Sequence, residues 1–295
     1  MHIKELSIDI GGRHLAAIDF GGSVERTVLA VHGWLDNAAS FMELAPRLEG
    51  CRIIAVDLAG HGRSAWRDQS SWYAIWDYVF DLRMAIEALG LQQVHLLGHS
   101  LGAAVTSVLA GASPERVASL VMIEGLGPLT IDSDETPEQL YEALEWHASA
   151  QSTPVVYRDP ERMVAARMRG RFPVGPVAAN HLVSRAVRPV EGGYGWTHDP
   201  RLLAPSLLRF SEDQVQALFR RIGVPVLVCL AEGGISTDKT RKRLGLLEHL
   251  RLIEFAGGHH PHLEPETVDR VADAVNLFYC DLHKGVSVRT EALAR

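Results

Sequence analysis

The feature that most constrains this chain is a serine between two glycines, at the junction of two apolar segments. Val94–Leu97 is a continuous apolar run, Gly98-His99-Ser100-Leu101-Gly102 follows it, and Leu101–Ala110 is small, apolar and helical in pattern. The junction predicts a tight turn from a buried strand into a helix, with a strained serine backbone. Such a turn presents the Ser100 hydroxyl beside free helix N–H groups that suit a developing oxyanion. The alternative is a serine that only caps the helix.

Strand-like and helix-like segments alternate on both sides of this junction. Continuous apolar runs predict strands of a parallel sheet that helices cover on both faces. The expected strands are Arg52–Val56, Val94–Leu97, Val117–Ile123, Val224–Leu230 and Leu250–Phe255, and the expected helices are Ile75–Leu89, Leu101–Ala110 and Thr267–Leu282. Earlier in the chain, His2–Ile10 and Arg13–Phe20 predict an antiparallel hairpin, and Thr27–Val31 predicts a third strand.

The alternation stops in the middle of the chain. The stretch after Glu124 contains short helical patterns at Pro137–Ala150 and Pro160–Arg169, and no strand pattern until Val224. Because structureless loops of this length are rare, the stretch predicts an inserted helical cap. The expected domains are a core of residues 1–124 and 222–295 and a cap of residues 125–221.

Composition excludes several classes of protein. The formal net charge is −7 and the pI is near 6.0, which is not the basic character of a nucleic-acid binder. No run of about 18 apolar residues occurs, so no membrane-spanning helix is expected. The three cysteines are widely spaced, and charges stand near the N-terminus where a signal peptide needs apolar residues. We therefore expect free, buried thiols at Cys51 and Cys229 and a cytoplasmic location.

Four stretches of the chain together resemble the α/β-hydrolase superfamily. They are Gly98-His99-Ser100-Leu101-Gly102, His32-Gly33-Trp34, Asp57-Leu58-Ala59-Gly60-His61-Gly62-Arg63-Ser64 and Gly258-His259. Three longer stretches are most similar to the serine hydrolase-like subgroup: His32-Gly33-Trp34-Leu35-Asp36-Asn37, Glu124-Gly125-Leu126-Gly127-Pro128 and Gly258-His259-His260-Pro261-His262-Leu263. The resemblance implies an α/β-hydrolase fold, with a mostly parallel sheet of about eight strands flanked by helices and an inserted helical cap.

A serine nucleophile needs a base to take its proton, and histidine titrates in the appropriate range. The expected strand Leu250–Phe255 is followed by a loop that contains His259. His259 directly follows Gly258 and stands five residues before Glu264, which matches the G-H-x-x-x-x-E pattern of the family. We therefore expect His259 to be the base.

Two other roles for the neighbouring histidines are weaker. A metal site of His259, His260 and His262 is disfavoured because Pro261 interrupts the set and no Asp or Cys ligands are nearby. His99 as the base is disfavoured because a residue adjacent to the serine in this turn points away from it. We expect neither a metal ion nor an organic cofactor.

The third member of the triad is a carboxylate that orients the histidine. Many family members carry it as an Asp just after the strand that corresponds to Val226–Leu230, but this sequence has Gly234 at that position. Glu124 ends the preceding strand, as the acid does in some cap-bearing relatives, and it keeps the chain order Ser, acid, His. We therefore expect Glu124 to be the acid, with Glu232 as the alternative.

The oxyanion of an acyl-transfer intermediate needs two N–H donors. The resemblance implies that these are the backbone N–H groups of Trp34 and Leu101. It also implies a substrate-binding region formed by His32, Gly33, Trp34 and His99, in which the glycine permits close approach and His99 packs toward the sheet.

Two sets of cap residues have two interpretations each. Six aromatic residues either line an apolar cavity or form plain cap core: Tyr141, Trp146, Tyr157, Phe172, Tyr194 and Trp196. The arginines from Arg162 to Arg171 either bind an acidic group of the substrate or form a solvated helix face.

These residues predict a serine hydrolase that cleaves a small carboxylic ester through an acyl-enzyme, with a triad of Ser100, His259 and Glu124. Carbon–carbon bond hydrolysis, lactonase activity and acyl transfer would use the same triad. A non-catalytic binding member of the fold is the alternative from another class, because the usual Asp is missing at Gly234. The expected partner is a small ester-type substrate, with no nucleic acid and no membrane span, and the chain is expected to be a monomer or homodimer.

Overall fold

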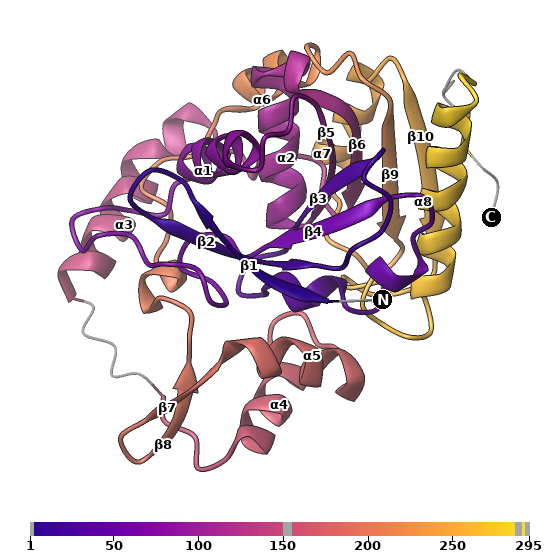
Figure 1. The fold of residues 1–295 in the computed structure, drawn as a ribbon. Coiled ribbons are helices and arrows are strands. Elements are labelled where there is room, and N and C mark those ends of the chain that lie inside the picture. The colour runs from indigo at the N-terminus through magenta and orange to yellow at the C-terminus, as the bar shows by residue number, and fades with distance from the viewer. Residues whose placement is uncertain (1–2, 150–154, 287–290, 293–295) are drawn as a thin grey trace.

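The computed structural model describes residues 3–149, 155–286 and 291–292. Figure 1 shows a central twisted sheet with helices on both faces and a smaller lobe below it. The strands are β1 (Lys4–Asp9), β2 (His14–Asp19), β3 (Thr27–Val31), β4 (Arg52–Val56), β5 (Val94–His99), β6 (Val117–Ile123), β7 (Val187–Val190), β8 (Gly193–Trp196), β9 (Val226–Ala231), β10 (Leu250–Phe255) and β11 (Glu291–Ala292). The α-helices are α1 (Ile75–Ala88), α2 (Leu101–Ala112), α3 (Thr136–Ser149), α4 (Pro160–Met168), α5 (Pro176–Ala186), α6 (Glu212–Phe219), α7 (Asp238–Arg241) and α8 (Val268–His283). None of these helices, in the part of the chain described, has the length and apolarity that crossing a bilayer requires.

The main sheet has the strand order β1-β2-β4-β3-β5-β6-β9-β10-β11. β1 pairs with β2 and β2 with β4 in antiparallel fashion, and the remaining neighbours pair in parallel. The predicted hairpin and the predicted parallel sheet are both confirmed. The strands from β1 to β10 in this order match the expected number of about eight, and β11 adds an edge strand of two residues.

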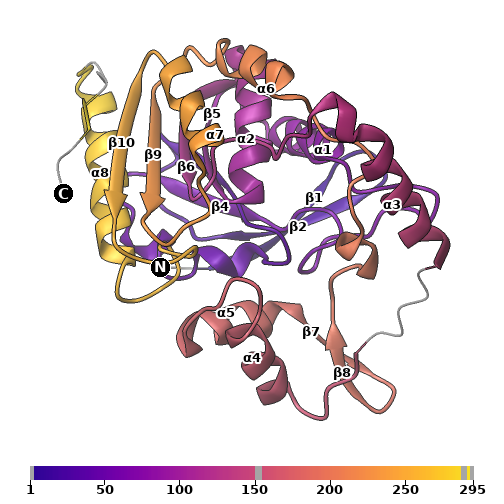
Figure 2. The ribbon, with the colours of Figure 1, turned by 180° about the vertical axis from the view of Figure 1, so that it is seen from behind.

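Two hydrophobic cores lie on opposite faces of the sheet. Alternate residues of β3 enter different cores, with Leu29 and Val31 packing with α1, α2 and α6, and Val28 and Ala30 packing with α8. Because the strands are buried on both faces, their sequences are continuous apolar runs rather than alternating ones. Figure 2 shows α8 outside β10, whereas α1 and α6 lie near α2. Cys51 and Cys229 are buried free thiols in the α8 core, as predicted.

The segment between β6 and β9 is not purely helical. After α3, α4 and α5 it contains an antiparallel hairpin of β7 and β8. The prediction that this segment lacks strands is wrong. The hairpin turn uses Gly192 and Gly193, whose φ angles of 83° and 151° suit glycine. Each strand has only four residues and β7 includes Pro189, so the pattern is too short to identify from the sequence.

Helix α6 packs with the sheet rather than with the lobe. Its residues Val215 and Phe219 lie in the same core as α1 and α2, and Figures 1 and 2 both show α6 beside the end of α2. In the same views α4, α5, β7 and β8 form the separate lobe below the sheet. We therefore propose that the cap ends before α6, rather than at residue 221 as the sequence pattern indicated.

Candidate active site

Ser100 lies in a sharp turn between β5 and α2. Its backbone has φ 52° and ψ −112°, a combination that costs conformational energy for a residue with a side chain. The flanking glycines are required by close contacts, because a Cβ on Gly102 would lie 1.9 Å from the carbonyl oxygen of Val31. A Cβ on Gly98 would lie 2.5 Å from the backbone of Gly102. The turn leaves Ser100 partly exposed, so its hydroxyl is accessible to a substrate.

His259 lies in the loop after β10, at the same carboxyl edge of the parallel strands as the turn that carries Ser100. Its Nε2 is 2.9 Å from Ser100 Oγ, and its Nδ1 is 3.3 Å from Glu124 Oε2. A carboxylate only accepts hydrogen bonds, so Nδ1 carries the proton and Nε2 is free to accept the proton of the serine hydroxyl. The imidazole is 7% exposed, which limits competition from water.

Glu124 follows the last residue of β6, and its side chain is fully buried. The backbone N–H of Ala231 donates to Oε1 at 2.5 Å, and the backbone N–H of Ile235 donates to Oε2 at 3.1 Å. These two donors, together with His259, hold the carboxylate in one orientation. Within the described residues, no lysine or arginine forms an ion pair with Glu124, so its charge faces the imidazole.

The glycine at position 234 makes room for this carboxylate. A Cβ on Gly234 would lie 1.9 Å from Glu124 Oε2. The place where many relatives carry an Asp is therefore filled by the longer side chain of Glu124, which reaches it from the neighbouring strand. Glu232, the alternative acid, is exposed and forms no hydrogen bond or ion pair with His259 in the part of the chain that the structure describes.

Backbone strain is concentrated at this site. Among the described residues, the positive φ angles at residues other than glycine belong to Leu35, Ser100 and Glu124, at 60°, 52° and 50°. Ser100 and Glu124 are the two residues whose side chains contact His259, and Leu35 follows the expected oxyanion donor Trp34. Strained residues persist where the surrounding structure holds them, and they cluster at functional sites.

The loop from His32 to Trp34 lies beside the start of α2. Within residues 3–149, 155–286 and 291–292, neither Trp34 N–H nor Leu101 N–H has a hydrogen-bond acceptor. Both are therefore free to bind an oxygen, as expected of oxyanion donors. The indole Nε1 of Trp34 donates to the carbonyl of Leu202 at 2.9 Å, which fixes the ring against the end of the inserted segment.

His32 and His99, two residues of the expected substrate-binding region, are buried behind this loop with no exposed surface. The N–H of Leu58 donates to His32 Nε2 at 3.0 Å, and His32 Nδ1 lies 2.7 Å from the carbonyl of Gly33, so both ring nitrogens are used in holding the loop. Burial lowers the pKa of His32 and keeps the ring neutral. His99 Nε2 is 2.7 Å from the carbonyl oxygen of His259 and so supports the loop of that histidine.

The three histidines of the 259–262 loop have separate partners. His259 contacts Ser100, His260 Nε2 is 3.0 Å from Asp36 Oδ2, and His262 Nε2 is 2.8 Å from Ser40 Oγ. They therefore do not converge on one point as the ligands of a metal ion would.

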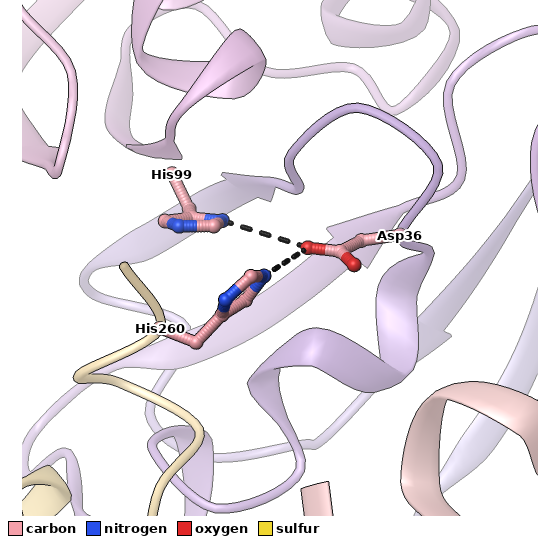
Figure 3. A group of neighbouring side chains, drawn as sticks. All are labelled: Asp36, His99 and His260. Atoms are coloured by element: carbon pink, nitrogen blue, oxygen red, sulfur yellow. Dashed lines mark hydrogen bonds and ion pairs between the residues drawn. The ribbon is translucent and has the colours of Figure 1, made fainter. Parts of the chain in front are cut away.

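A different cluster, drawn in Figure 3, brings Asp36, His99 and His260 together, with one possible ligand atom from each within 4.8 Å of the others. The guanidinium of Arg167 lies 2.9 Å from Asp36 Oδ1 and 3.1 Å from His260 Nε2, and already supplies the positive charge there. A Cβ on Gly33 would lie 2.9 Å from His99 Nδ1 and 3.1 Å from Asp36 Oδ2, so the backbone fills the remaining space. The cluster is an ion-pair network rather than a fitting metal site.

Charges in this network determine its protonation. Burial would raise the pKa of Asp36, but the attraction of His260 and Arg167 holds that pKa well below its ordinary value. Burial, followed by the neighbouring imidazoles, lowers the pKa of His99 well below its ordinary value. Asp36 is therefore a carboxylate and His99 a neutral ring. The sequence does not single out Asp36, which lies in the quoted stretch from His32 to Asn37, and it offers Arg167 only as one of the arginines from Arg162 to Arg171.

Some of the cap aromatics and arginines point toward the active site, whereas others are exposed or pack within the cap. Phe172 packs on His259, with ring centroids 4.3 Å apart, whereas Tyr141 is exposed and Tyr157 packs on Trp196 within the hairpin region. Among the arginines, Arg167 turns inward. The others of the run are exposed, Arg162 on α4 and Arg169 and Arg171 beyond its last residue, Met168.

Known proteins resemble this chain in both sequence and structure. Residues 26–154 match the family described as alpha/beta hydrolase fold. The Drosophila melanogaster protein named "Probable serine hydrolase" is 30% identical over 292 residues, which cover 93% of this chain and 87% of the fly protein. A Danio rerio protein named "Serine hydrolase-like protein" is 29% identical over 269 residues, covering 85% of this chain and 82% of its own.

Solved structures extend this similarity to the whole fold. A crystal structure of a hypothetical protein from Pseudomonas aeruginosa PAO1 has a TM-score of 0.90 and 41% identity, covering 94% of this chain and 99% of its own. The structure of E-2-(acetamidomethylene)succinate hydrolase has a TM-score of 0.75 and 25% identity, covering 95% of this chain and all of its own. Together with the strand order and the strained serine turn, these similarities show that the chain belongs to the α/β-hydrolase superfamily, among its serine hydrolase-like proteins.

Proposed function

We propose that the protein is a serine hydrolase that cleaves a small carboxylic ester through an acyl-enzyme. The observation that carries the proposal is the alignment of His259 between Ser100 Oγ at 2.9 Å and Glu124 Oε2 at 3.3 Å. This is the separation at which a base can take the proton of a hydroxyl while a carboxylate orients its other nitrogen.

The proposed reaction has two steps. Ser100 Oγ attacks the ester carbonyl while His259 Nε2 takes its proton, and His259 then returns that proton to the leaving alcohol. The N–H groups of Trp34 and Leu101 stabilise the oxyanion of the tetrahedral intermediate. Water then attacks the acyl-enzyme, with His259 again as the base, and releases the acid and Ser100. Glu124 stabilises the imidazolium in both steps, and within the described residues no lysine or arginine is paired with it.

The alternative of a non-catalytic binding protein depends on the missing Asp at position 234. The space above Gly234 holds the carboxylate of Glu124, so that reason for doubting a triad is removed. Bond types other than esters would use the same residues. The hydrolase title of one structural neighbour supports hydrolysis in general and does not define the bond for this chain.

A series of p-nitrophenyl esters with increasing acyl length tests the proposal. We expect turnover of the short esters by the wild-type protein and loss of turnover in Ser100→Ala, which removes the nucleophile and leaves the turn intact. The acyl length at which kcat/KM begins to fall measures the space beneath the cap. Equal turnover by wild type and Ser100→Ala, in protein that unfolds at the same temperature, would refute the proposed mechanism.

A further inference from the structure

The last turn of α4 sends one arginine from the lobe toward the active site. Arg167 Nη2 donates to Asp36 Oδ1 at 2.9 Å, and Arg167 Nη1 donates to the backbone carbonyl of Phe172 at 2.7 Å. One guanidinium therefore joins the loop that follows Trp34 to the cap segment 167–172. Asp36 is 3% exposed, so this ion pair is shielded from water on the carboxylate side.

Arg167 binds the backbone carbonyl of Phe172, and the Phe172 ring covers one face of the His259 ring. The two ring centroids are 4.3 Å apart and the planes are inclined at 38°. The aromatic contact excludes water from that face and restricts rotation of the imidazole. Phe172 thus has the direct contact with His259, and Arg167 fixes the position of Phe172.

Asp36 also contacts the loop that carries His259. His260, the next residue in the chain, lies 3.0 Å from Asp36 Oδ2. Asp36 therefore connects two structures that meet at His259, namely the cap segment through Arg167 and the histidine loop through His260. A change that releases Arg167 would free Phe172 and leave in place the two backbone N–H groups, of Ala231 and Ile235, that hold Glu124.

We propose that Arg167 is a positioning residue of the active site: its ion pair with Asp36 holds Phe172 against His259 and keeps the imidazole oriented toward Ser100. The proposal rests on the proposed serine hydrolase function. Arg171 lies over the Phe172 ring, 5.5 Å from its centroid, but among the described residues Arg167 is the arginine of this run that pairs with Asp36. Arg169 is exposed and forms no ion pair among the residues that the structure describes, so it is the matched control.

The test compares Arg167→Met with Arg169→Met, using p-nitrophenyl acetate as a substrate too small to need the cap for binding. We expect kcat of Arg167→Met to fall about tenfold with KM within about twofold of wild type, because orientation of the base is lost and binding is not. Arg169→Met is expected to match wild type. Equal kcat in both variants, or a loss confined to KM, would overturn the proposal.

The conservative variant Arg167→Lys separates geometry from charge. A lysine keeps the charge but cannot bridge Asp36 and the Phe172 carbonyl with a planar fork. We expect its kcat to lie between those of wild type and Arg167→Met. If the kcat of Arg167→Lys is as low as that of Arg167→Met, the planar bridge itself is required and the charge alone is not enough. A wild-type kcat in Arg167→Met would contradict any role of the bridge.

The double variant Arg167→Met with Phe172→Ala tests whether the arginine acts through the phenylalanine. If it does, the double variant loses no more activity than Phe172→Ala alone, because the two residues act in series. Losses that multiply would show that Arg167 acts by another route and would overturn the proposal. If Arg167→Met does not fold, Phe172→Ala carries the test: its ion pair remains, and wild-type kcat in this variant would overturn the proposal.

Failure of this inference is distinguishable from failure of the proposed function. A fluorophosphonate probe applied to the wild-type protein reports whether Ser100 is reactive at all. An unlabelled wild type contradicts the serine hydrolase proposal and this inference with it. If the probe labels the wild type and labels Arg167→Met at the same rate, the positioning role is contradicted and the serine hydrolase proposal is not.

Discussion

Two buried carboxylates contact neighbouring histidines of one loop, Glu124 at His259 and Asp36 at His260, and they are held in opposite ways. Glu124 is held by two backbone N–H groups and His259, without an ion pair to any lysine or arginine of the described chain. Asp36 is paired with Arg167 and His260. The charge of Asp36 is already compensated before any reaction begins, whereas the charge of Glu124 is directed at the imidazole. We therefore expect Glu124 to stabilise an imidazolium at His259 as it forms, and Asp36 to act mainly in holding the surrounding loops.

The largest expected effect comes from Glu124→Gln. The amide keeps the size of the side chain but removes the charge that orients and stabilises His259. We expect kcat/KM for p-nitrophenyl esters to fall about 10³–10⁴-fold. Replacing one acceptor oxygen by an amide also leaves a backbone donor unpaired, at a cost of about 1–3 kcal/mol in unfolding free energy. Near-normal turnover in folded Glu124→Gln would remove Glu124 from the triad.

A second change, Gly234→Ala, adds a methyl group in the space that the Glu124 carboxylate occupies. In Gly234→Ala, the new Cβ would lie 1.9 Å from Glu124 Oε2, so the carboxylate must move away from His259. We expect kcat/KM to fall about 100-fold, the cost of an ångström-scale misplacement. Gly245→Ala is the matched control, because a Cβ there meets nothing within 4 Å. If both alanine variants retain full activity, the account of Gly234 is wrong.

Asp36→Asn is expected to lower the stability strongly and the activity only weakly, the opposite of Glu124→Gln. Removing one partner of a buried ion pair leaves Arg167 uncompensated, and we expect the unfolding free energy to fall by about 3 kcal/mol. The expected loss in kcat is only about tenfold, since the triad residues are untouched. Chemical denaturation and ester hydrolysis on the same preparations measure both. A loss of activity as large as that of Glu124→Gln, without a loss of stability, would contradict the division of roles.

The smallest expected effect concerns pH. Burial, then the neighbouring imidazoles, lowers the pKa of His99 and His262 well below 6.5, whereas the unfolded chain binds protons near that pH. Stability is therefore complete above pH 6.5 and declines as the pH falls below it, by about 1 kcal/mol per histidine between pH 6.5 and 5.5.

Denaturation curves across this pH range, recorded for wild type and His262→Gln, measure the effect. We expect a shallower decline in His262→Gln. Asp36 contributes in a different window: its pKa is lowered from 3.8, so its contribution is lost only as the pH falls below that value. An unfolding free energy that stays constant between pH 6.5 and 5.5 would show that these rings are not neutral in the folded state.

The sequence predicts the parts of this molecule that local pattern determines. The serine turn follows from an apolar strand, two glycines and a helical segment, and the gap at Gly234 together with a glutamate at the end of a strand points to Glu124. The short hairpin of β7 and β8 escapes prediction because each strand has four residues. Helix α6 was assigned to the cap because its position in the sequence does not reveal that Val215 and Phe219 pack on the sheet.

The contact between Arg167 and Asp36 is the part that no local pattern reveals. The two residues are 131 positions apart, and Arg167 belongs to an arginine-rich stretch whose other members face solvent. Arg167 is partly buried whereas Arg162, in the same helix, is exposed, and only the docking of α4 determines which of them turns inward. The strained backbone at Leu35 and Glu124 is equally invisible in sequence, whereas the strain at Ser100 follows from the predicted turn.

The central claim is that Ser100 is the activated nucleophile, and covalent labelling tests it most directly. The wild-type protein is treated with a fluorophosphonate, digested, and the modified peptide is identified by mass spectrometry. The account predicts one adduct, on Ser100, which disappears in Ser100→Ala and forms at least about 10³-fold more slowly in Glu124→Gln. An adduct on another serine, or no adduct on folded wild-type protein, would contradict it.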